Sequence, residues 1–355
     1  MASSRSDRNE YEGSSWDAFA EEYEKRVEPF TSKFAEEMLH LILSGKNDNE
    51  NKKVYSCESA LEPAAQEEHD ASSERRRLKL LDVGCGTGAA TLLALSQGVD
   101  VVATDVSEAM VERTKERSFA AIRSRDNTAT TEHRSQSKSQ LEAMSDSAVA
   151  TGQDLPSCWS GSFDLAVANF SVIFFPQPVL GLKEIFRCLV PGTGIASLTA
   201  WGDASETPAF RVFPDVVSEV LPELIETGKP KRITGSVEVL TKILEEAGFV
   251  DVKVEGPVFK TLIVKSPSEY YDRFALTSPP TAAMIAKMEV ETRSEFRKRV
   301  MEVAMARGGQ EDGSTALDSG AYIAYGRKPA PMKLLEETKQ KQKPEHDSTQ
   351  QQHRL

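Results

Sequence analysis

The feature that most constrains the fold is a short apolar segment that runs directly into three glycines at alternate positions. Residues 78–84 have the sequence LKLLDVG, and residues 84–88 have the sequence GCGTG. An apolar run of this length that ends in glycines is typical of a buried strand in a parallel sheet. Glycine has no Cβ, so the chain can turn tightly and a ligand can approach the backbone. The segment therefore predicts a strand, a tight turn and a helix, with backbone amides near the carboxyl end of the strand.

Strands and helices alternate along the rest of the chain. Further apolar segments predict strands at 99–105, 163–170, 194–201 and 249–254. Segments with helical spacing or capping residues predict helices at 89–96, 107–117, 178–190 and 236–247. Only residues 148–151 are available for a strand between the second of these helices and Asp164. This order predicts an α/β fold with a parallel sheet and helices on both faces.

The chain is best explained as one domain over residues 14–328. Apolar residues at helical spacing over residues 14–43 predict a helical cap, which Pro29 divides into two helices. The polar segments at about 45–75 and 118–148 cannot bury enough apolar surface to fold, so we expect disordered insertions. Residues 1–13 and the polar tail at 329–355 are expected to be disordered as well.

Charge and cysteine content exclude several classes of function. The chain has 43 Lys and Arg against 55 Asp and Glu, and this net charge of −12 does not favour a nucleic-acid partner. No stretch of 18 apolar residues is present, so no membrane span is expected. The first 13 residues contain three acids and no apolar run, which does not favour a secretory signal. The four cysteines are scattered without a CxxC spacing, so we expect no metal site, reduced thiols and a cytoplasmic location.

Two aspartates strengthen the case for a ligand at the glycine turn. Asp82 lies inside the predicted strand, where a carboxylate needs partners such as turn amides or a ligand ammonium group. Asp105 ends the next strand, where an acid is placed to accept both hydroxyls of a ribose. A nicotinamide dinucleotide site is the alternative, because Gly84, Gly86 and Ala89 satisfy the Gly-x-Gly-x-x-Gly/Ala form. Asp82 and the third alternate glycine, Gly88, favour a different cofactor.

At this point the chain resembles the class I S-adenosylmethionine-dependent methyltransferases, in the type 11 branch related to the ubiquinone/menaquinone C-methyltransferases. The resemblance covers most of residues 14–328 and rests on the segments LDVGCGTG (81–88), ATDVSEAM (103–110), GQDLPSCWSGSFDLAVANFSVIFFPQP (152–178), EIFRCLVPGTGIASLTAW (184–201), LTKILEEAGFVDVKV (240–254) and AYIAYGRKP (321–329). It implies a Rossmann-like, doubly wound, mostly parallel seven-stranded sheet in the order 3-2-1-4-5-7-6, with the last strand antiparallel. It also implies a helical lid, which we expect at about 203–235 and 266–310.

The resemblance implies that the cofactor is S-adenosyl-L-methionine and that the product is S-adenosyl-L-homocysteine. The residues expected to bind the cofactor are Asp82, Gly84, Cys85, Gly86, Gly88, Asp105, Val106 and Asn169. Asp82 would orient the amino-acid end, Asp105 would hold the ribose and Val106 would lie against the adenine. In the family, an acid four residues before a Leu-Pro pair contacts the adenine amine. Here Thr151 occupies that position, and Asp154 is shifted by three residues.

We expect methyl transfer to a small, moderately apolar acceptor by in-line displacement. The sulfonium methyl is already activated, so the protein mainly supplies position and environment. No catalytic residue can be named, although Tyr23, Asn169 and Trp201 are candidates to face the acceptor. Apolar residues at 209–221 and 281–305 are candidates for the wall of its pocket. The alternatives are a nicotinamide-dependent oxidoreductase and a non-catalytic protein that binds the cofactor, and the oligomeric state is unknown.

Overall fold

The structure is a computed structural model that describes residues 13–44, 76–126, 147–222 and 234–331. Its centre is a seven-stranded sheet in the order β3-β2-β1-β4-β5-β7-β6. The strands are β1 Lys79–Val83, β2 Asp100–Asp105, β3 Ala148–Val149, β4 Leu165–Ala168, β5 Ile195–Trp201, β6 Val250–Val264 and β7 Thr315–Arg327. Strands β1 to β5 pair in parallel, and β7 runs antiparallel to both of its neighbours. The predicted fold class and strand order are therefore confirmed.

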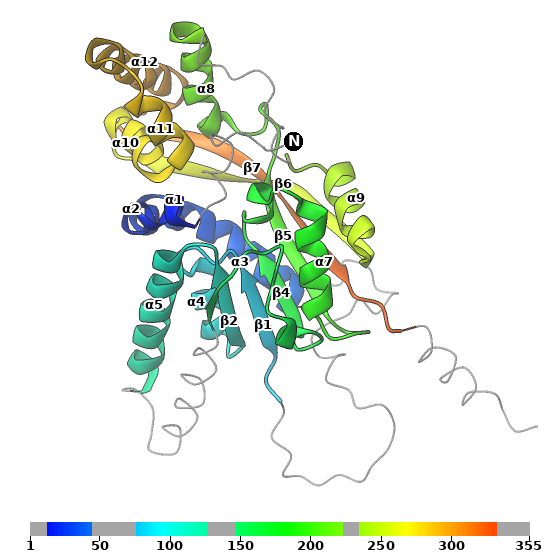
Figure 1. Ribbon diagram of the computed structural model, residues 1–355. Helices are drawn as coiled ribbons and strands as arrows, with labels where there is room; N and C mark the ends of the chain where they lie inside the picture. Colours follow the sequence, from blue (N-terminus) through cyan, green and yellow to red (C-terminus); the bar gives the residue numbers. More distant parts are fainter. Residues whose placement is uncertain (1–12, 45–75, 127–146, 223–233, 332–355) are drawn as a thin grey trace, which may run out of the picture.

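Helices cover both faces of this sheet (Figure 1). The described helices are α1 Ser14–Asp17, α2 Ala20–Arg26, α3 Glu28–Ser44, α4 Ala89–Ser96, α5 Glu108–Asp126, α7 Pro178–Cys188, α8 Pro208–Val220, α9 Val237–Ala247, α10 Pro267–Thr277, α11 Pro279–Ala286 and α12 Val290–Gly308. Leu80 and Val101 pack with residues of α3 and α4, whereas Leu81 and Val102 belong to the cluster formed with α7 and α9. This alternation follows from the period of two residues along a strand, and it makes the central strands apolar on both faces.

Capping residues determine where several helices begin and end. Ser236 accepts a hydrogen bond from the Val239 amide at the start of α9, and Gly248 ends that helix with φ of +104°. Pro29 is the second residue of α3, where a missing amide hydrogen costs nothing. The break between α2 and α3 therefore lies at Val27, two residues before the proline that predicts it.

Strands β6 and β7 are much longer than the sequence predicts, and they extend toward the helices that the sequence analysis assigns to a lid. They pair as far as Val264 and Thr315, beyond the end of the central sheet. At Gly256-Pro257 the pairing of β6 with β7 shifts register. Strand β6 therefore continues through a Gly-Pro pair, although such a pair usually ends a strand. Helices α8, α10, α11 and α12 gather around the far end of this antiparallel pair of strands (Figure 1).

The start predicted for the second polar insertion, residue 118, is wrong. Helix α5 continues to Asp126, and it buries Ser118 and Ile122. These two residues lie four positions apart on the same helix face as Thr114, so the buried stripe continues through a mostly polar segment. Residues 127–146 of that insertion, the insertion at 45–75, residues 1–12 and the tail from 332 lie outside the described residues, and the predicted end of the insertion at 148 falls in β3.

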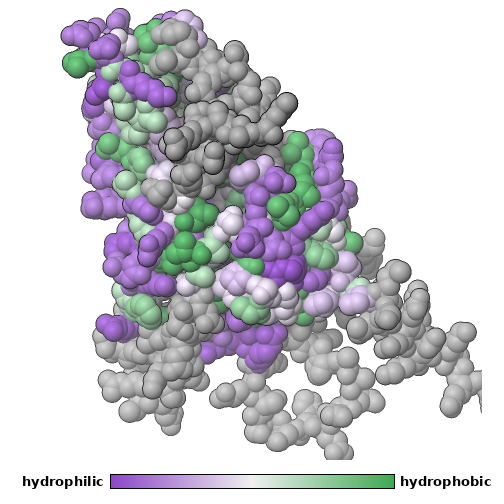
Figure 2. All heavy atoms as spheres, viewed as in Figure 1, coloured by the Kyte–Doolittle hydropathy of each residue, from purple (hydrophilic) through white to green (hydrophobic). Residues whose placement is uncertain are grey.

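The surface is mostly polar on the face shown in Figure 2, where apolar side chains lie in small separate groups. No helix in the described part of the chain has both the length and the apolar character needed to cross a membrane.

Candidate functional site

The glycine turn after β1 is closed by hydrogen bonds to β2. The amides of Gly84 and Cys85 both donate to the Thr104 carbonyl, at 2.7 and 3.0 Å. Gly84, Gly86 and Gly88 have φ of +71°, +54° and +99°, a backbone conformation that glycine adopts without strain. A Cβ on Gly84 would lie 2.3 Å from the Cβ of Ser171, so position 84 has no room for any other residue. The turn therefore has a defined shape that presents its backbone to the space above β1 and β2.

Asp105 joins the glycine turn to the start of α5. Its Oδ2 accepts from the Gly86 amide at 2.9 Å, and its Oδ1 accepts from the Ser107 amide at 3.0 Å. Burial raises the pKa of Asp105, while the backbone amides of Ser107 and Gly86 oppose that rise. Each carboxylate oxygen retains capacity for a further hydrogen bond. The side chain is thus held rigidly at the carboxyl end of β2 and can accept from a ligand.

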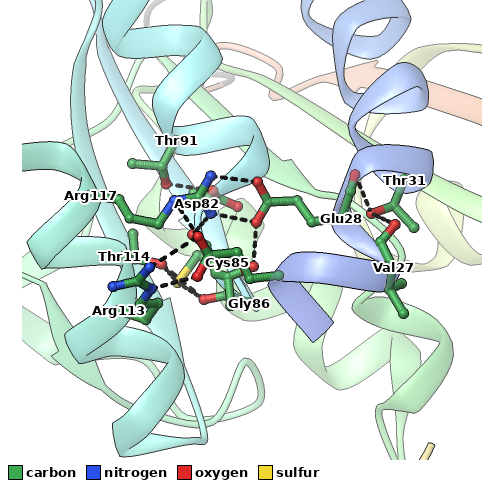
Figure 3. Close-up of polar contacts among 12 residues, drawn as sticks. Val27, Glu28, Thr31, Asp82, Cys85, Gly86, Thr91, Arg113, Thr114 and Arg117 are labelled. Carbon is green, nitrogen blue, oxygen red and sulfur yellow. Dashed lines mark hydrogen bonds and ion pairs between the residues drawn. The ribbon is translucent and has the colours of Figure 1, made fainter. Parts of the chain in front are cut away.

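Asp82 lies behind the turn rather than in it. Its side chain is 1% exposed, and Oδ2 accepts from the Thr91 hydroxyl at 2.7 Å (Figure 3). Oδ1 is buried without a hydrogen-bond partner. Burial raises the pKa of Asp82 to about 6, with a smaller contribution from Asp105. An orphaned carboxylate oxygen at this point fits a cationic or hydrogen-donating ligand group.

Ion pairs and hydrogen bonds attach the N-terminal helices α1 to α3 to the glycine turn and to the start of α5. Arg117 of α5 donates to both oxygens of Glu28 at 2.5 and 2.7 Å, and it also donates to the Thr87 carbonyl at 2.6 Å (Figure 3). Asp17 of α1 accepts from the Ser107 hydroxyl at 2.5 Å, at the N-terminus of α5. These contacts hold the three helices α1, α2 and α3 over the glycine turn.

Tyr23 and Trp16 form the inner surface of these helices. The ring of Tyr23 lies 3.6 Å from the position of a Cβ on Gly86. Trp16 makes edge contacts with Tyr23 and with Phe174, at ring separations of 6.5 and 5.3 Å. Burial raises the pKa of Tyr23 to about 12, so its hydroxyl is protonated at neutral pH and is a hydrogen-bond donor.

Aromatic residues enclose the opposite end of the site. Trp201, at the end of β5, stacks on Phe170 at 3.8 Å and contacts Phe210 at 4.6 Å. Asn169 follows β4 and is held from both sides: its Oδ1 accepts from Thr199, and its Nδ2 donates to the Thr31 carbonyl. Phe170 has φ of +56°, which is unusual for an aromatic residue and is typical of functional loops.

One cavity of about 400 Å³ joins the two ends. Five of the predicted cofactor residues line it: Gly84, Gly86, Asp105, Val106 and Asn169. The three predicted acceptor-facing residues, Tyr23, Asn169 and Trp201, line it as well. The cavity is mostly apolar with a few polar groups, which is typical of small-molecule sites.

Three predicted cofactor residues, Asp82, Cys85 and Gly88, lie outside this lining. Burial raises the pKa of the Cys85 thiol well above its usual value, so the thiol stays protonated. Thr151, the residue at the position of the family's adenine acid, lines the cavity, whereas Asp154 does not and is exposed. Asp105 is the one acidic residue among the residues that line this cavity. No second acid of the lining therefore takes the place of the family's adenine acid, where this chain has Thr151.

One charged residue of the cavity, Arg273 of α10, is not predicted from the sequence. It lies 168 positions after Asp105, and it enters the cavity beside Phe274 and Thr277. A signal was present, because Tyr270, Phe274 and Thr277 mark one face of α10 and Arg273 interrupts that face with a charge. Within the described residues, no group of three or more His, Cys, Asp or Glu side chains is arranged to hold a metal ion.

Comparison with known proteins identifies the domain. Residues 81–195, from β1 to the first residue of β5, match a family described as a methyltransferase domain. An uncharacterized methyltransferase of Schizosaccharomyces pombe, C70.08c, is 26% identical over 212 residues, which cover 56% of this chain and 68% of that protein.

Two solved structures are similar at low identity. Phosphoethanolamine N-methyltransferase 2 of Haemonchus contortus, in complex with phosphomonomethylethanolamine and S-adenosylhomocysteine, is 17% identical with a TM-score of 0.39. The match covers 73% of this chain, which spans only 50% of that protein. The YcgJ protein of Bacillus subtilis is 16% identical with a TM-score of 0.42, over 72% of this chain and 93% of that one.

The chain carries a class I S-adenosylmethionine-dependent methyltransferase domain, and its cofactor is S-adenosylmethionine. The predicted class is thereby confirmed. The more specific resemblance to the ubiquinone/menaquinone branch stays a prediction.

Proposed function

We propose that the chain transfers the methyl group of S-adenosylmethionine to a small, moderately apolar acceptor by in-line displacement. The observation that carries this proposal is a continuous cavity that joins the Asp105 end of the glycine turn to the aromatic enclosure around Trp201. A methyl donor at the first end and an acceptor at the second would share one enclosed space.

The cofactor would bind with its ribose hydroxyls donating to Asp105. Val106 and Thr151 would lie at the adenine end, and Gly84, Gly86 and Gly88 would shape the turn beside the ribose and methionine. Cys85 contributes through its backbone, because its thiol is buried against Thr114. Asp82 would offer its unpartnered Oδ1 to the ammonium group of the methionine, directly or through water.

The reaction needs orientation more than acid–base chemistry. A sulfonium methyl is already activated, and alignment of an acceptor with the S–CH₃ bond can contribute up to about 7–11 kcal/mol. Asn169 is immobilised by two hydrogen bonds beside the Trp201 wall, so it can fix an acceptor or the methionine end in place. The phenol of Tyr23, with a pKa of about 12, acts there as a donor and not as a general base at neutral pH.

The test is a calorimetric titration with S-adenosylhomocysteine. Asp105→Asn keeps the shape of the side chain but removes its charge, and we expect an affinity weaker by about 10- to 100-fold. Asp154→Asn is the matched control, because Asp154 is exposed and outside the cavity lining. NADH serves as the comparison ligand.

Each outcome decides between the alternatives. Binding of S-adenosylhomocysteine that depends on Asp105, with no heat from NADH, supports the proposal. Binding of NADH alone would favour the nicotinamide-dependent oxidoreductase. Binding of S-adenosylmethionine without turnover on a panel of phenolic, quinone-like and fatty acceptors would favour a non-catalytic protein. The cytoplasmic location stays a prediction, which fractionation of cells that express the tagged chain would check.

A further inference from the structure

Arg273 is a buried cation that forms no ion pair with any described residue. Its side chain is 9% exposed and lines the cavity. Its Nε is buried without a hydrogen-bond partner, and among the described residues no ion pair or hydrogen bond to its guanidinium is found. Glu269, one turn earlier on α10, partly opposes the fall in the pKa of Arg273, but its carboxylate accepts from the Lys265 amide and forms no ion pair with Arg273. The guanidinium therefore has up to five donor hydrogens to offer inside the cavity.

This arrangement is costly for the folded protein. Burial lowers the pKa of Arg273 to about 10, yet the group stays protonated at neutral pH. A buried charge without a partner destabilises a fold, and such groups are found paired or bound to a ligand. The described residues supply no hydrogen-bonded or ion-paired partner for this cation, so a bound ligand is a candidate for that role.

The position of Arg273 assigns it to the acceptor end of the cavity. Helix α10 packs against α2, α11 and α12, and α2 also packs against α5, the helix that follows Asp105. Tyr23 of α2 covers Gly86. Arg273 is instead next to Phe274, whose ring contacts Phe210 at 5.7 Å. Phe210 in turn contacts Trp201, so the cation and the aromatic wall bound the same space.

We propose that Arg273 binds an oxyanion group of the methyl acceptor, a carboxylate or a phosphate. This rests on the proposed function and specifies its substrate class: a small molecule with an apolar or aromatic body and an acidic end. The planar guanidinium matches either oxyanion with two parallel hydrogen bonds. The aromatic wall around Trp201 holds the apolar body, and the pair of contacts sets which atom of the acceptor faces the methyl group.

The test measures binding of matched probes to the protein saturated with S-adenosylhomocysteine. The probes are 3-phenylpropionate, its neutral amide and phenyl phosphate. Their binding is measured by thermal shift and by calorimetry. We expect at least one of the two acids to bind about ten times more tightly than the amide. Arg273→Met should abolish that preference, and Arg273→Lys should keep part of it. Arg299→Met is the control, because it makes the same change on the lid surface, where Arg299 pairs with Glu219.

A preference for the carboxylate or for the phosphate identifies which oxyanion is bound. Equal binding of the acids and the amide would overturn the proposal, as would a preference that survives in Arg273→Met. The proposal is also overturned if no probe at millimolar concentration stabilises the wild-type protein more than Arg273→Met.

A second measurement tests whether Arg273 instead binds the methionine carboxylate of the cofactor. If Arg273 holds the methionine carboxylate, Arg273→Met weakens S-adenosylhomocysteine about tenfold or more but leaves 5′-methylthioadenosine, which lacks that carboxylate, unchanged. That result would overturn the acceptor assignment and leave the proposed function standing. If wild-type protein binds neither nucleoside, the proposed function fails, and the probe series is then repeated without them to test the oxyanion site alone.

Discussion

Replacement of Asp82 by asparagine should stabilise the protein at neutral pH. The carboxyl has a pKa of about 6 in the folded chain, against the usual 3.8, because burial disfavours its charged form. The difference of about 2 pH units corresponds to about 3 kcal/mol of folding free energy at about 1.36 kcal/mol per unit. The side-chain amide of the Asp82→Asn variant would keep an oxygen to accept from Thr91 and would carry no charge to bury.

The direction in which stability changes with pH follows from how tightly the folded and unfolded states bind the Asp82 proton. Between about pH 4 and 6 the folded state holds this proton more tightly than the unfolded state, so stability falls as pH rises through that range. The contribution is complete below about pH 4 and is lost above about pH 6. By the same linkage, about 2 kcal/mol of the effect falls between about pH 4.5 and pH 7.0. Other carboxylates change the absolute stability, so the informative quantity is the difference between variant and wild type.

The assay is urea unfolding of the ligand-free protein at about pH 4.5 and pH 7.0. We expect the Asp82→Asn variant to gain about 2 kcal/mol relative to wild type between these two conditions. Asp154→Asn, an exposed substitution, should change stability little at either pH. A difference that stays constant with pH, or a variant that loses stability at neutral pH, would refute the argument from burial.

Two further predictions concern the turn and its cover. Gly84→Ala should lower the free energy of unfolding by about 2 kcal/mol or more and abolish S-adenosylhomocysteine binding, because the new Cβ would lie 2.3 Å from the Ser171 side chain. Gly98→Ala is the control: Gly98 has φ of +80° but no atom within 4 Å of a Cβ, so urea unfolding should show a loss of only about 1 kcal/mol. Equal losses in both variants would show that backbone strain alone decides. Asp17→Ala should lower stability by about 1 kcal/mol and weaken S-adenosylhomocysteine severalfold in calorimetry, because α1 loses its hold on the start of α5; unchanged affinity would contradict a role for this contact in closing the site.

Much of the cofactor end could be predicted because its parts are local. A strand, a glycine turn and a helix are consecutive in the chain, so Gly84, Gly86 and their neighbours are positioned by a few adjacent residues. Asp105 ends the adjacent parallel strand, and carboxyl ends of such strands meet at one edge of a sheet. The sequence pattern therefore predicts that they come together, and all three line the cavity.

Element boundaries were harder to predict where a local signal and tertiary packing disagree. The polar composition after residue 118 suggests an insertion, but Ser118 and Ile122 are buried against the core, and this contact extends α5. Gly256-Pro257 suggests the end of a strand, but pairing with β7 continues β6 to Val264. In both cases, contacts with distant residues outweigh a local preference.

The class of fold, the glycine turn and the acid beside it are encoded locally, because they follow from periodicity and from neighbours along the chain. What closes over that turn and what faces the acceptor instead depend on how distant segments pack. The contacts of Asp17 with α5 and of Arg117 with Glu28 join residues about 90 positions apart. Arg273 reaches the cavity because α10 follows the long strand β6, which pairs with β7 beyond the end of the central sheet. Whether a lone arginine on an amphipathic helix is paired, solvated or left open to a ligand depends on packing partners that no local pattern encodes.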